Sequence, residues 1–461
     1  MPRCFFALLL GAMGCGASTP AGPAGRPAAA SGAPEAGAPA EKKGKEDPLF
    51  PDRPSADLGK LDPATRARVL ALGDDTRAFL DRGKTPRRAV AALVDLDRGT
   101  GAAPLADGAR LAAGARAYWV APGGDAAVLL LGGKGPAVRA VVAVVDAPRI
   151  DLKQVPIYQH GGGAWFDTAL YGELSLEHWL TRPLALYLRV DRGARSAPVD
   201  LAIGDRPGDP VLAIPDVPIH LARHIQHDAK VDTAERLDAF AGASARSLEA
   251  ALRKHGVRPR DLAEAEAYLV PAGPAVAVGV DRALIGGYGA AHRAVAYAAV
   301  RALAAARPGE STRAVVLISK SQVGGSGSTG LAFVGRALSR AIRAAAGDDI
   351  DGLVWRRALA RSSLVYATGV DADLSHGLLI SPIGDDALPG ALRPLLDRLT
   401  AAGAPVTTTD KAFYDVRQLA ELNLDAVGLG IAARGIGAPM ELISAVALHH
   451  AQRGLEAWLA D

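Results

Sequence analysis

Short apolar runs alternate with longer amphipathic stretches along most of the chain. The first amphipathic stretch opens at Asp62-Pro63, an N-cap followed by proline at the first helical position, and continues to Phe79. Apolar runs between Gly or Pro signals are typical of buried strands. We predict strands at 126–131, 140–145, 184–190, 275–280 and 315–319, and further helices at 293–306, 331–346, 391–402 and 441–459. This alternation predicts an α/β sandwich around a largely parallel or mixed sheet.

Two parts of the chain depart from this pattern. Residues 151–265 contain the most polar and His-rich stretch of the sequence. Residues 16–48 consist mainly of Gly, Ala, Pro and Ser, with a charged cluster near their end. Because such a composition buries too little apolar surface to offset the entropy of ordering, we predict a disordered tether over residues 15–50.

The extreme N-terminus has the form of a targeting segment. Arg3 precedes an apolar core at 5–10 and small residues up to Cys15, which predicts a signal peptide over 1–14. The stretch before Cys15 resembles a bacterial lipobox, in which the Cys becomes the lipidated first residue of the mature chain. A plain signal peptide cut elsewhere is the alternative. Gly16 follows instead of the Asp that would indicate inner-membrane retention. We expect a lipoprotein of the bacterial cell envelope, on the outer-membrane or periplasmic face, that contacts the membrane only through its lipid.

Composition and charge exclude several classes of protein. With 461 residues, 49% of them hydrophobic and 22% charged, the chain can bury a sizeable core and is not disordered throughout. The formal net charge of +3, with no sustained basic block, argues against a nucleic-acid binder that relies on phosphate neutralisation. The two cysteines, Cys4 and Cys15, both lie in the targeting segment, so neither a disulfide framework nor a Cys-based zinc site is expected.

Several short segments, spread over residues 65–460, share an order with one known family. They are V-V-D-A-P-R-I-D-L-K at 144–153, Y-G at 171–172 with P-L-A-L at 183–186, D-P-V at 209–211 with I-H-L-A at 219–222, G-V-D-R at 279–282 with G-Y-G at 287–289, K-S-Q-V-G at 320–324 with G-S-T-G at 327–330, and P-M-E at 439–441. Together they resemble the aspartyl aminopeptidases, also called aminopeptidase I, a family of zinc metallopeptidases, and its bacterial branch in particular.

The resemblance implies a domain organisation. It predicts a three-layer α/β sandwich of the zinc-aminopeptidase type from residues 51–150 and 266–461, with a β-rich, dimerisation-type domain inserted at 151–265. Because the insert makes subunit contacts in the family, a homo-oligomer is expected. In the family two zinc ions bind five ligands, a Glu acts as general base, and an Asp orients the first His ligand.

Most of the family's functional side chains are replaced in this sequence. Asp146 retains the orienting carboxylate. The resemblance places the first His ligand on Val144, the metal-bridging Asp on Ala291, the general base on Ser321, the neighbouring Glu ligand on Gln322, the ligand Asp on Thr368 and the last His on Gly437. Asp371, Asp373 and His292 are nearby in the sequence and are possible substitutes.

These replacements predict that no zinc is bound. A catalytic zinc ion takes three or four donors from His, Cys or carboxylate groups, and Val, Ala and Gly side chains donate nothing. Without metal there is no activated water, and without a carboxylate at position 321 no group takes its proton. We therefore expect a pseudoenzyme that binds peptides or acts as a scaffold. The alternative is a divergent zinc aminopeptidase that releases N-terminal acidic residues, with ligands at positions not recognised here.

Other candidate sites have simpler interpretations. One face of a predicted helix carries His220, His224 and His227. These histidines form either a metal site or simply a polar helix face. His220 also resembles the His that family members lend to a neighbouring active site, so it and Asp146 are candidate ligand-binding residues. The Gly-rich run 324–330 lacks the ending of a phosphate-binding loop, and Ser321 and Ser326 lack a nucleophile-elbow motif. Two further pairs have no assigned role, namely His449-His450, which point apart on a helix, and Trp165-Phe166, which are core or interface residues.

Overall fold

The computed structural model describes residues 58–193, 196–215, 237–320, 329–347, 350–381, 390–409 and 424–460, together with Phe413 and Leu419. Several predicted features lie outside these residues. They are the signal peptide 1–14, the lipidated Cys15, the tether 15–50, His220, His224, His227, Ser321, Gln322, Ser326 and most of the Gly-rich run.

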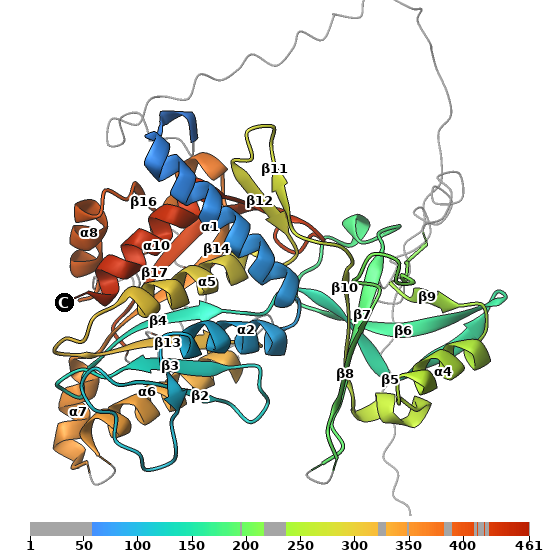
Figure 1. Ribbon diagram of the computed structural model, residues 1–461, viewed down its shortest axis with the longest axis horizontal. Coiled ribbons are helices and arrows are strands. Elements are labelled where there is room, and N and C mark those ends of the chain that lie inside the picture. Colours follow the sequence, from blue (N-terminus) through green and yellow to red (C-terminus); the bar gives the residue numbers. More distant parts are fainter. Residues whose placement is uncertain are drawn as a thin grey trace, which may run out of the picture. The chain divides into compact units, whose positions relative to one another are not determined.

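A mixed sheet forms the centre of the larger part of the fold (Figure 1). Its strand order is β1-β2-β3-β13-β4-β14-β17-β18-β12-β11, and β15 pairs with both β17 and β16. Strands β13, β4, β14 and β17 run parallel, so their carboxyl ends meet at one edge of the sheet. The bounds are β1 Ala103–Pro104, β2 Arg116–Val120, β3 Ala127–Leu131, β4 Val138–Val144, β11 Val276–Val278, β12 Leu284–Gly287, β13 Thr312–Ile318, β14 Ser363–Asp371, β15 Leu378–Ser381, β16 Val406–Thr408, β17 Ala426–Arg434 and β18 Glu441–Ser444.

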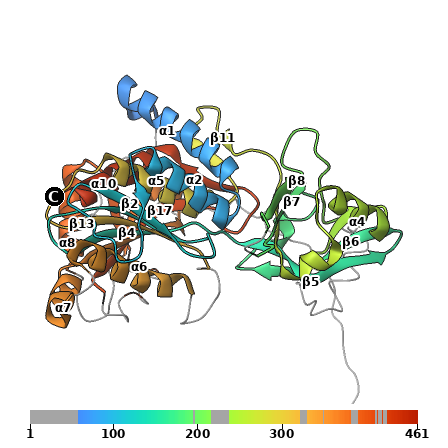
Figure 2. The ribbon, with the colours of Figure 1, turned by 60° about the horizontal axis from the view of Figure 1, so that its bottom comes forward.

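Helices cover both faces of this sheet and make it the middle of three layers. Successive residues of β4 point to opposite faces: Val141 and Ala143 join one buried cluster, whereas Val142 and Val144 join the other. Figure 2 shows α1, α2, α5 and α10 on one side of the sheet and α6 and α7 on the other. The helices are α1 Pro63–Arg82, α2 Pro86–Arg98, α5 Ala290–Ala305, α6 Thr329–Ala346, α7 Gly352–Ala360, α8 Leu392–Ala401 and α10 Ala445–Leu459. Within the described residues, none of the helices is long and apolar enough to cross a membrane.

A second, antiparallel sheet has the strand order β8-β7-β10-β5-β6-β9 and its own buried cluster. Its elements are β5 Arg149–His160, β6 Gly163–Tyr171, β7 Leu184–Val190, β8 Val199–Ile203, β9 Ala239–Gly242, β10 Glu266–Pro271 and the helix α4 Ala245–Lys254. The predicted limits of the inserted domain, 151–265, stay a prediction. Of the pair Trp165-Phe166, Phe166 is fully buried in this cluster, and Trp165 makes an edge contact with Phe240.

The predicted helices and strands are present, with shifts at their ends. Asp62 caps α1 as expected, accepting hydrogen bonds from Ala64 and Thr65. The strand predicted at 275–280 is shorter, because the chain turns at Gly279 with a φ of +87°. The prediction of one helix over 441–459 is wrong at its start, because Glu441–Ser444 pair with β12 and the helix begins at Ala445. Ser444 marks the boundary by accepting a hydrogen bond from the backbone N–H of Ala447.

Asp97, near the end of α2, is a buried carboxylate with few groups around it to stabilise its negative charge. Its side chain is fully buried, and neither carboxylate oxygen accepts a hydrogen bond within the described residues. Arg116 lies 3.9 Å away, but its guanidinium donates to the carbonyls of Leu303, Ala304 and Ala306. Burial raises the pKa of Asp97 to about 6, although the positive charge of Arg116 opposes the shift.

Asp97→Asn is expected to stabilise the protein at pH 7 by about 1–2 kcal/mol. Because the folded-state pKa is above the unfolded value, the folded state holds the extra proton, and this residue's contribution to stability falls as pH rises from about 4 to about 6. The variant should lack that decline. Urea unfolding at pH 4.5 and pH 7.5 measures both effects. A less stable variant at pH 7.5 would mean that the ion pair with Arg116 outweighs desolvation.

Candidate functional site

The positions singled out by the sequence meet at the carboxyl edge of the parallel strands. Val144 ends β4, and Thr368 lies in the neighbouring strand β14. Ala291 occupies the first turn of α5, whose backbone packs so closely on Gly369 that a Cβ there would lie 2.5 Å from the Cβ of Ala291. Gly437 precedes β18 and shares a hydrogen-bonding partner with Ala291. These four residues therefore belong to one place in the fold.

None of these four residues offers a zinc ion a strong donor. Val144 is a buried aliphatic residue in the core beneath α6, and Ala291 and Gly437 have no polar side chain. The Thr368 hydroxyl is 2.9 Å from Nδ1 of His292. The described residues also contain no group of three or more His, Cys, Asp or Glu side chains placed to hold a metal ion. Zinc therefore does not fit the described part of this site.

A buried carboxylate, Glu441, connects two of the positions to which the resemblance assigns metal ligands. Its Oε2 accepts a hydrogen bond of 2.8 Å from the backbone N–H of Ala291, and its Oε1 accepts one of 3.3 Å from that of Gly437. The first bond satisfies an unpaired N–H at the positive end of α5. Burial raises the pKa of Glu441 to about 7, while the two backbone N–H groups and the charge of Arg293 oppose the shift.

Gly437, to which the resemblance assigns the last His ligand, has no room for a side chain. Its φ is +84°, and a Cβ at this position would lie 2.3 Å from the backbone oxygen of Glu173. Its carbonyl accepts a 2.9 Å hydrogen bond from Nε1 of Trp179 and a 3.3 Å bond from the backbone N–H of Ser175. The 172–179 segment thus packs against the place where a metal-binding side chain would begin.

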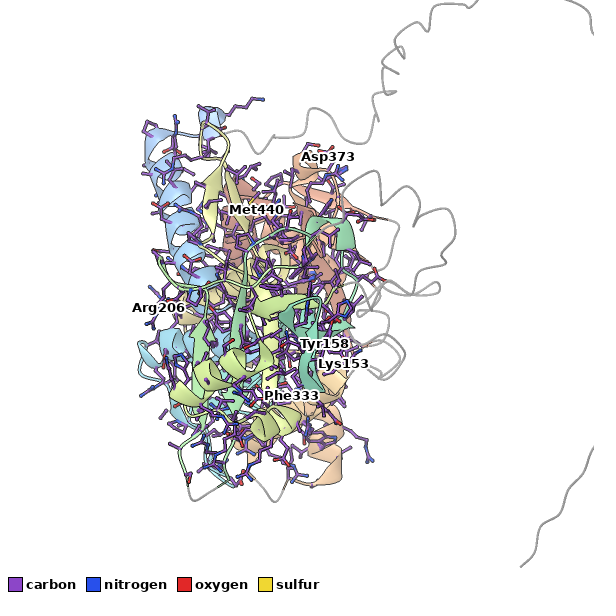
Figure 3. The ribbon with its side chains drawn as sticks, turned by 90° about the vertical axis from the view of Figure 1, so that its right-hand side faces the viewer. Lys153, Tyr158, Arg206, Phe333, Asp373 and Met440 are labelled. Carbon is purple, nitrogen blue, oxygen red and sulfur yellow. The ribbon has the colours of Figure 1, made fainter. Side chains whose placement is uncertain are left out.

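Of the possible substitute ligands, His292 alone lies at the site. Gly369 N–H lies 3.4 Å from its Nδ1, and burial lowers the pKa of His292 to about 4, so the imidazole is neutral at pH 7. Asp373 caps a short helical turn by accepting from the Ser375 N–H, and Figure 3 shows it at the outer edge of the molecule. Asp371 and Asp373 both face Arg434. A single imidazole already engaged through Nδ1 does not make a zinc site.

Asp146, the retained carboxylate, is fully buried and pairs with a tyrosine. It accepts a 2.6 Å hydrogen bond from the hydroxyl of Tyr171. Burial, together with the charge of Asp146, raises the pKa of Tyr171 far above its usual value, so the tyrosine remains the proton donor. The guanidinium of Arg149 stacks on Tyr171 at 3.7 Å from the ring centroid and pairs with Asp151 at 2.7 Å. Asp146 is therefore tied into a hydrogen-bonded network with the second sheet.

Arg293 is the buried cation of the site, and sequence reasoning missed it. Its guanidinium is fully buried, donates a 2.8 Å hydrogen bond from Nε to the Val145 carbonyl, and lies over the ring of Tyr288. Its positive charge acts on His292 and on Glu441. The one available signal was the polar pair His292-Arg293 within the Ala-rich sequence of α5.

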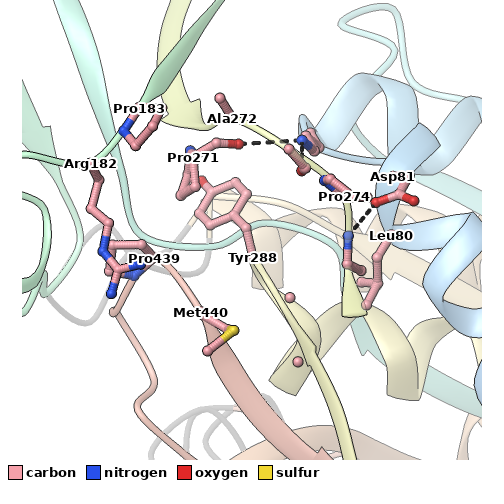
Figure 4. A pocket seen from close by; sticks show the side chains of 15 residues that line it. Leu80, Asp81, Arg182, Pro183, Pro271, Ala272, Pro274, Tyr288, Pro439 and Met440 are labelled. Carbon is pink, nitrogen blue, oxygen red and sulfur yellow. Dashed lines mark hydrogen bonds between the residues drawn. The ribbon is translucent and has the colours of Figure 1, made fainter. Parts of the chain in front are cut away.

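A cavity of about 140 Å³ lies next to this network, between α1 and the linker that follows β10 (Figure 4). The linker is held in place because Nζ of Lys84 donates to the carbonyls of Pro271 and Gly273, and Asp81 accepts from the backbone N–H of Ala275. The walls combine the charged residues Asp81, Lys84 and Arg182 with apolar ones, which include Tyr288, Met440 and four prolines, Pro183, Pro271, Pro274 and Pro439. The volume suits one small side chain.

Comparison with known families decides the identity of the fold. The sequence profile described as Aminopeptidase I zinc metalloprotease (M18) matches residues 79–376, more than half of the chain. The chain belongs to the M18 aminopeptidase I family. The "Probable M18 family aminopeptidase 1" of Thermotoga neapolitana is 30% identical over 317 residues, which cover 65% of this chain and 69% of that protein. The protein of the same name from Clostridium acetobutylicum is 26% identical over 451 residues, covering 87% and 97% of the two chains.

Solved structures of M18 aminopeptidases share the fold. The enzyme from Thermotoga maritima superimposes with a TM-score of 0.77 at 24% identity, over 89% of this chain and all of that one. The mApe1 dodecamer of S. cerevisiae superimposes with a TM-score of 0.68 at 14% identity, over 84% and 97% of the two chains. The predicted α/β fold is confirmed by these M18 structures.

Proposed function

We propose that this chain is a non-hydrolytic member of the M18 family, which binds peptides at the carboxyl edge of the parallel strands without cleaving them. One observation carries the proposal. Val144, Ala291, Thr368 and Gly437 supply no zinc donor of useful strength, and Glu441 is already engaged with the backbone at two of these positions. The site is held together by its own hydrogen bonds.

Electrostatics supports the same proposal. Two zinc ions would bring four positive charges to a place that already contains the buried guanidinium of Arg293. Burying an uncompensated ion costs several kcal/mol even after relaxation of the protein. Glu441 and Asp146 are buried carboxylates at this site, and both already accept hydrogen bonds from other groups of the protein. The charge balance therefore favours a site without metal.

A second candidate is a divergent zinc aminopeptidase that releases N-terminal acidic residues. The comparisons by themselves favour it, because relatives that span most of this chain carry the name probable M18 family aminopeptidase 1. Any missing ligands and a base would have to come from Ser321, Gln322, His220 or neighbours outside the described residues. Ser and Gln side chains are poor zinc ligands, which is why we place this candidate second.

The remaining parts of the proposal concern location and assembly. We place the protein in the bacterial cell envelope, anchored through a lipid on Cys15, because residues 1–15 have lipoprotein-signal form. We propose a homo-oligomer, supported by the dodecameric assembly of the structurally similar S. cerevisiae mApe1. No zinc cofactor and no nucleic-acid partner is part of this proposal.

A hydrolysis assay separates the two candidates. The full chain, supplied with zinc, is incubated with peptides that begin with Asp or Glu, and the M18 aminopeptidase of Thermotoga maritima serves as the positive control. We expect no release of the N-terminal residue, whereas calorimetric titration of the same peptides should give measurable binding. Release that a chelator abolishes would favour the second candidate.

A further inference from the structure

Helix α7 presents an unusual surface. Buried Ala358 and half-buried Trp355 and Leu359 attach the helix to the core beneath α6. At 100° per residue, Leu353, Val354, Arg356 and Arg357 occupy the opposite, solvent-facing arc, which Arg361, the C-cap residue directly after the helix, continues. Leu353 and Val354 are 45% and 39% exposed, and among the exposed large apolar residues of the described chain they are the one pair adjacent in sequence.

The arginines of α7 are not neutralised within the described residues. No hydrogen bond or ion pair within these residues involves the guanidinium groups of Arg356, Arg357 or Arg361. Arg357 and Arg361 are four positions apart, a spacing at which like charges on a helix repel. Asp351, at the start of α7, is engaged with the backbone N–H of Leu353.

The charge of this surface extends onto the neighbouring helix. Figures 1 and 2 both place α7 at the outer end of the layer formed by α6. Arg336 and Arg343 of α6 are exposed as well. Residues 329–361 carry six arginines against three aspartates, an excess as large as the net charge of the whole chain. The two aspartates that complete this count, Asp348 and Asp349, lie outside the described residues.

We infer that the exposed face of α7 docks on a bilayer surface that contains anionic phospholipid. Exposed arginines around protruding aliphatic side chains are the chemistry of an interfacial helix, in which the cations meet lipid phosphates and the apolar groups enter the boundary with the acyl chains. The guanidinium groups of Arg356, Arg357 and Arg361 match the lipid phosphates in charge, and the exposed Leu353 and Val354 match the apolar boundary beneath them. The sequence alone predicted that the protein contacts the membrane only through its lipid anchor. The docking of α7 is a second contact, in addition to that anchor.

Two surfaces allow a matched comparison. Arg356→Glu, Arg357→Glu and Arg361→Glu together reverse the charge of α7. Arg66→Glu, Arg68→Glu and Arg82→Glu make the same change in net charge at exposed positions of α1, on the other side of the sheet. A third variant, Leu353→Gln with Val354→Gln, removes the apolar part of α7 and keeps its charge. Circular dichroism and thermal unfolding check that each variant folds.

Vesicle sedimentation of the full chain carrying Cys15→Ser tests the docking without a lipid on the protein. We expect binding to mixed phosphatidylcholine and phosphatidylglycerol vesicles, little binding to pure phosphatidylcholine, and weakening by added salt. Each arginine lost near the surface should lower the partition constant about fivefold, so the α7 triple variant should lose about a hundredfold even before its new negative charges count. The α1 triple variant should bind like the parent, and the Leu353/Val354 variant should bind measurably more weakly.

Four results would overturn the proposal. The first three are no binding of the Cys15→Ser chain to the mixed vesicles, equal losses for the α7 and α1 triple variants, and displacement from the vesicles by single-stranded RNA at matched phosphate concentration. Binding that survives the α7 charge reversal would also overturn it, because the apolar residues 5–10 would then be responsible. None of these results depends on whether the chain binds zinc or cleaves peptides, so this proposal and the proposed function fail separately.

Discussion

Gly437→Ala is expected to destabilise the folded protein by about 3 kcal/mol or more, one of the largest effects of any single methyl group in this chain. The new Cβ would lie 2.3 Å from the backbone oxygen of Glu173, and the φ of +84° is unfavourable for alanine. Relief would require moving the 172–179 segment, whose Trp179 donates a hydrogen bond to the carbonyl of Gly437. Urea unfolding monitored by tryptophan fluorescence measures the loss.

Gly403→Ala is the matched control. Gly403 also has a positive φ, +67°, but a Cβ there meets no atom within 4 Å. This variant should lose only the backbone term, about 1 kcal/mol. Equal losses at the two positions would contradict the close contact at Gly437. The contact also means that any side chain introduced at 437 requires the 172–179 segment to move first.

Arg293→Met should cost about 2–3 kcal/mol of folding free energy, because it removes a charged hydrogen-bond donor and the positive charge that favours the ionised form of buried Glu441. The carbonyl of Val145 also loses its 2.8 Å donor. Arg301→Met, on the same helix, is the control: its ion pair with Asp75 is partly exposed, so its loss should cost no more than about 1 kcal/mol.

A double-mutant cycle assigns the cost of Arg293→Met to its electrostatic partner. If Arg293 compensates Glu441, the pair Arg293→Met with Glu441→Gln should be more stable than the sum of the single losses predicts. The pH dependence has a defined sign. The pKa of Glu441 in the folded state, about 7, is above its unfolded value, so this residue's contribution to stability falls as pH rises from about 4.5 to about 7. Arg293→Met should steepen that decline, and Glu441→Gln should abolish it. Additive losses would contradict the coupling.

Much of the fold could be predicted from local signals. The Asp62-Pro63 cap fixed the start of α1, and short apolar runs bounded by Gly or Pro marked β3, β4, β7 and β13. The short strand β18 was absorbed into the helix predicted after it, because Leu442 and Ile443 are separated from the apolar start of α10 by Ser444 alone. Ser444, an N-cap residue type, was the local sign of the boundary.

The site was predictable only in part. Family spacing assigned Val144, Ala291, Thr368 and Gly437, and the structure brings these four positions together. The interactions that occupy the site could not be derived from spacing, because they join residues far apart in the sequence. Glu441 reaches the backbone of Ala291 across 150 positions, and Arg293 reaches the carbonyl of Val145 across 148. Such pairings depend on the folded arrangement of the strands.

The zinc content of the full chain tests the central claim most directly. The protein is incubated with excess zinc, desalted, and measured by inductively coupled plasma mass spectrometry, with the Thermotoga maritima M18 aminopeptidase treated in parallel. Because the described site lacks donors and contains a buried guanidinium, the account predicts far less than one zinc ion per chain. Two tightly held zinc ions per chain would contradict it.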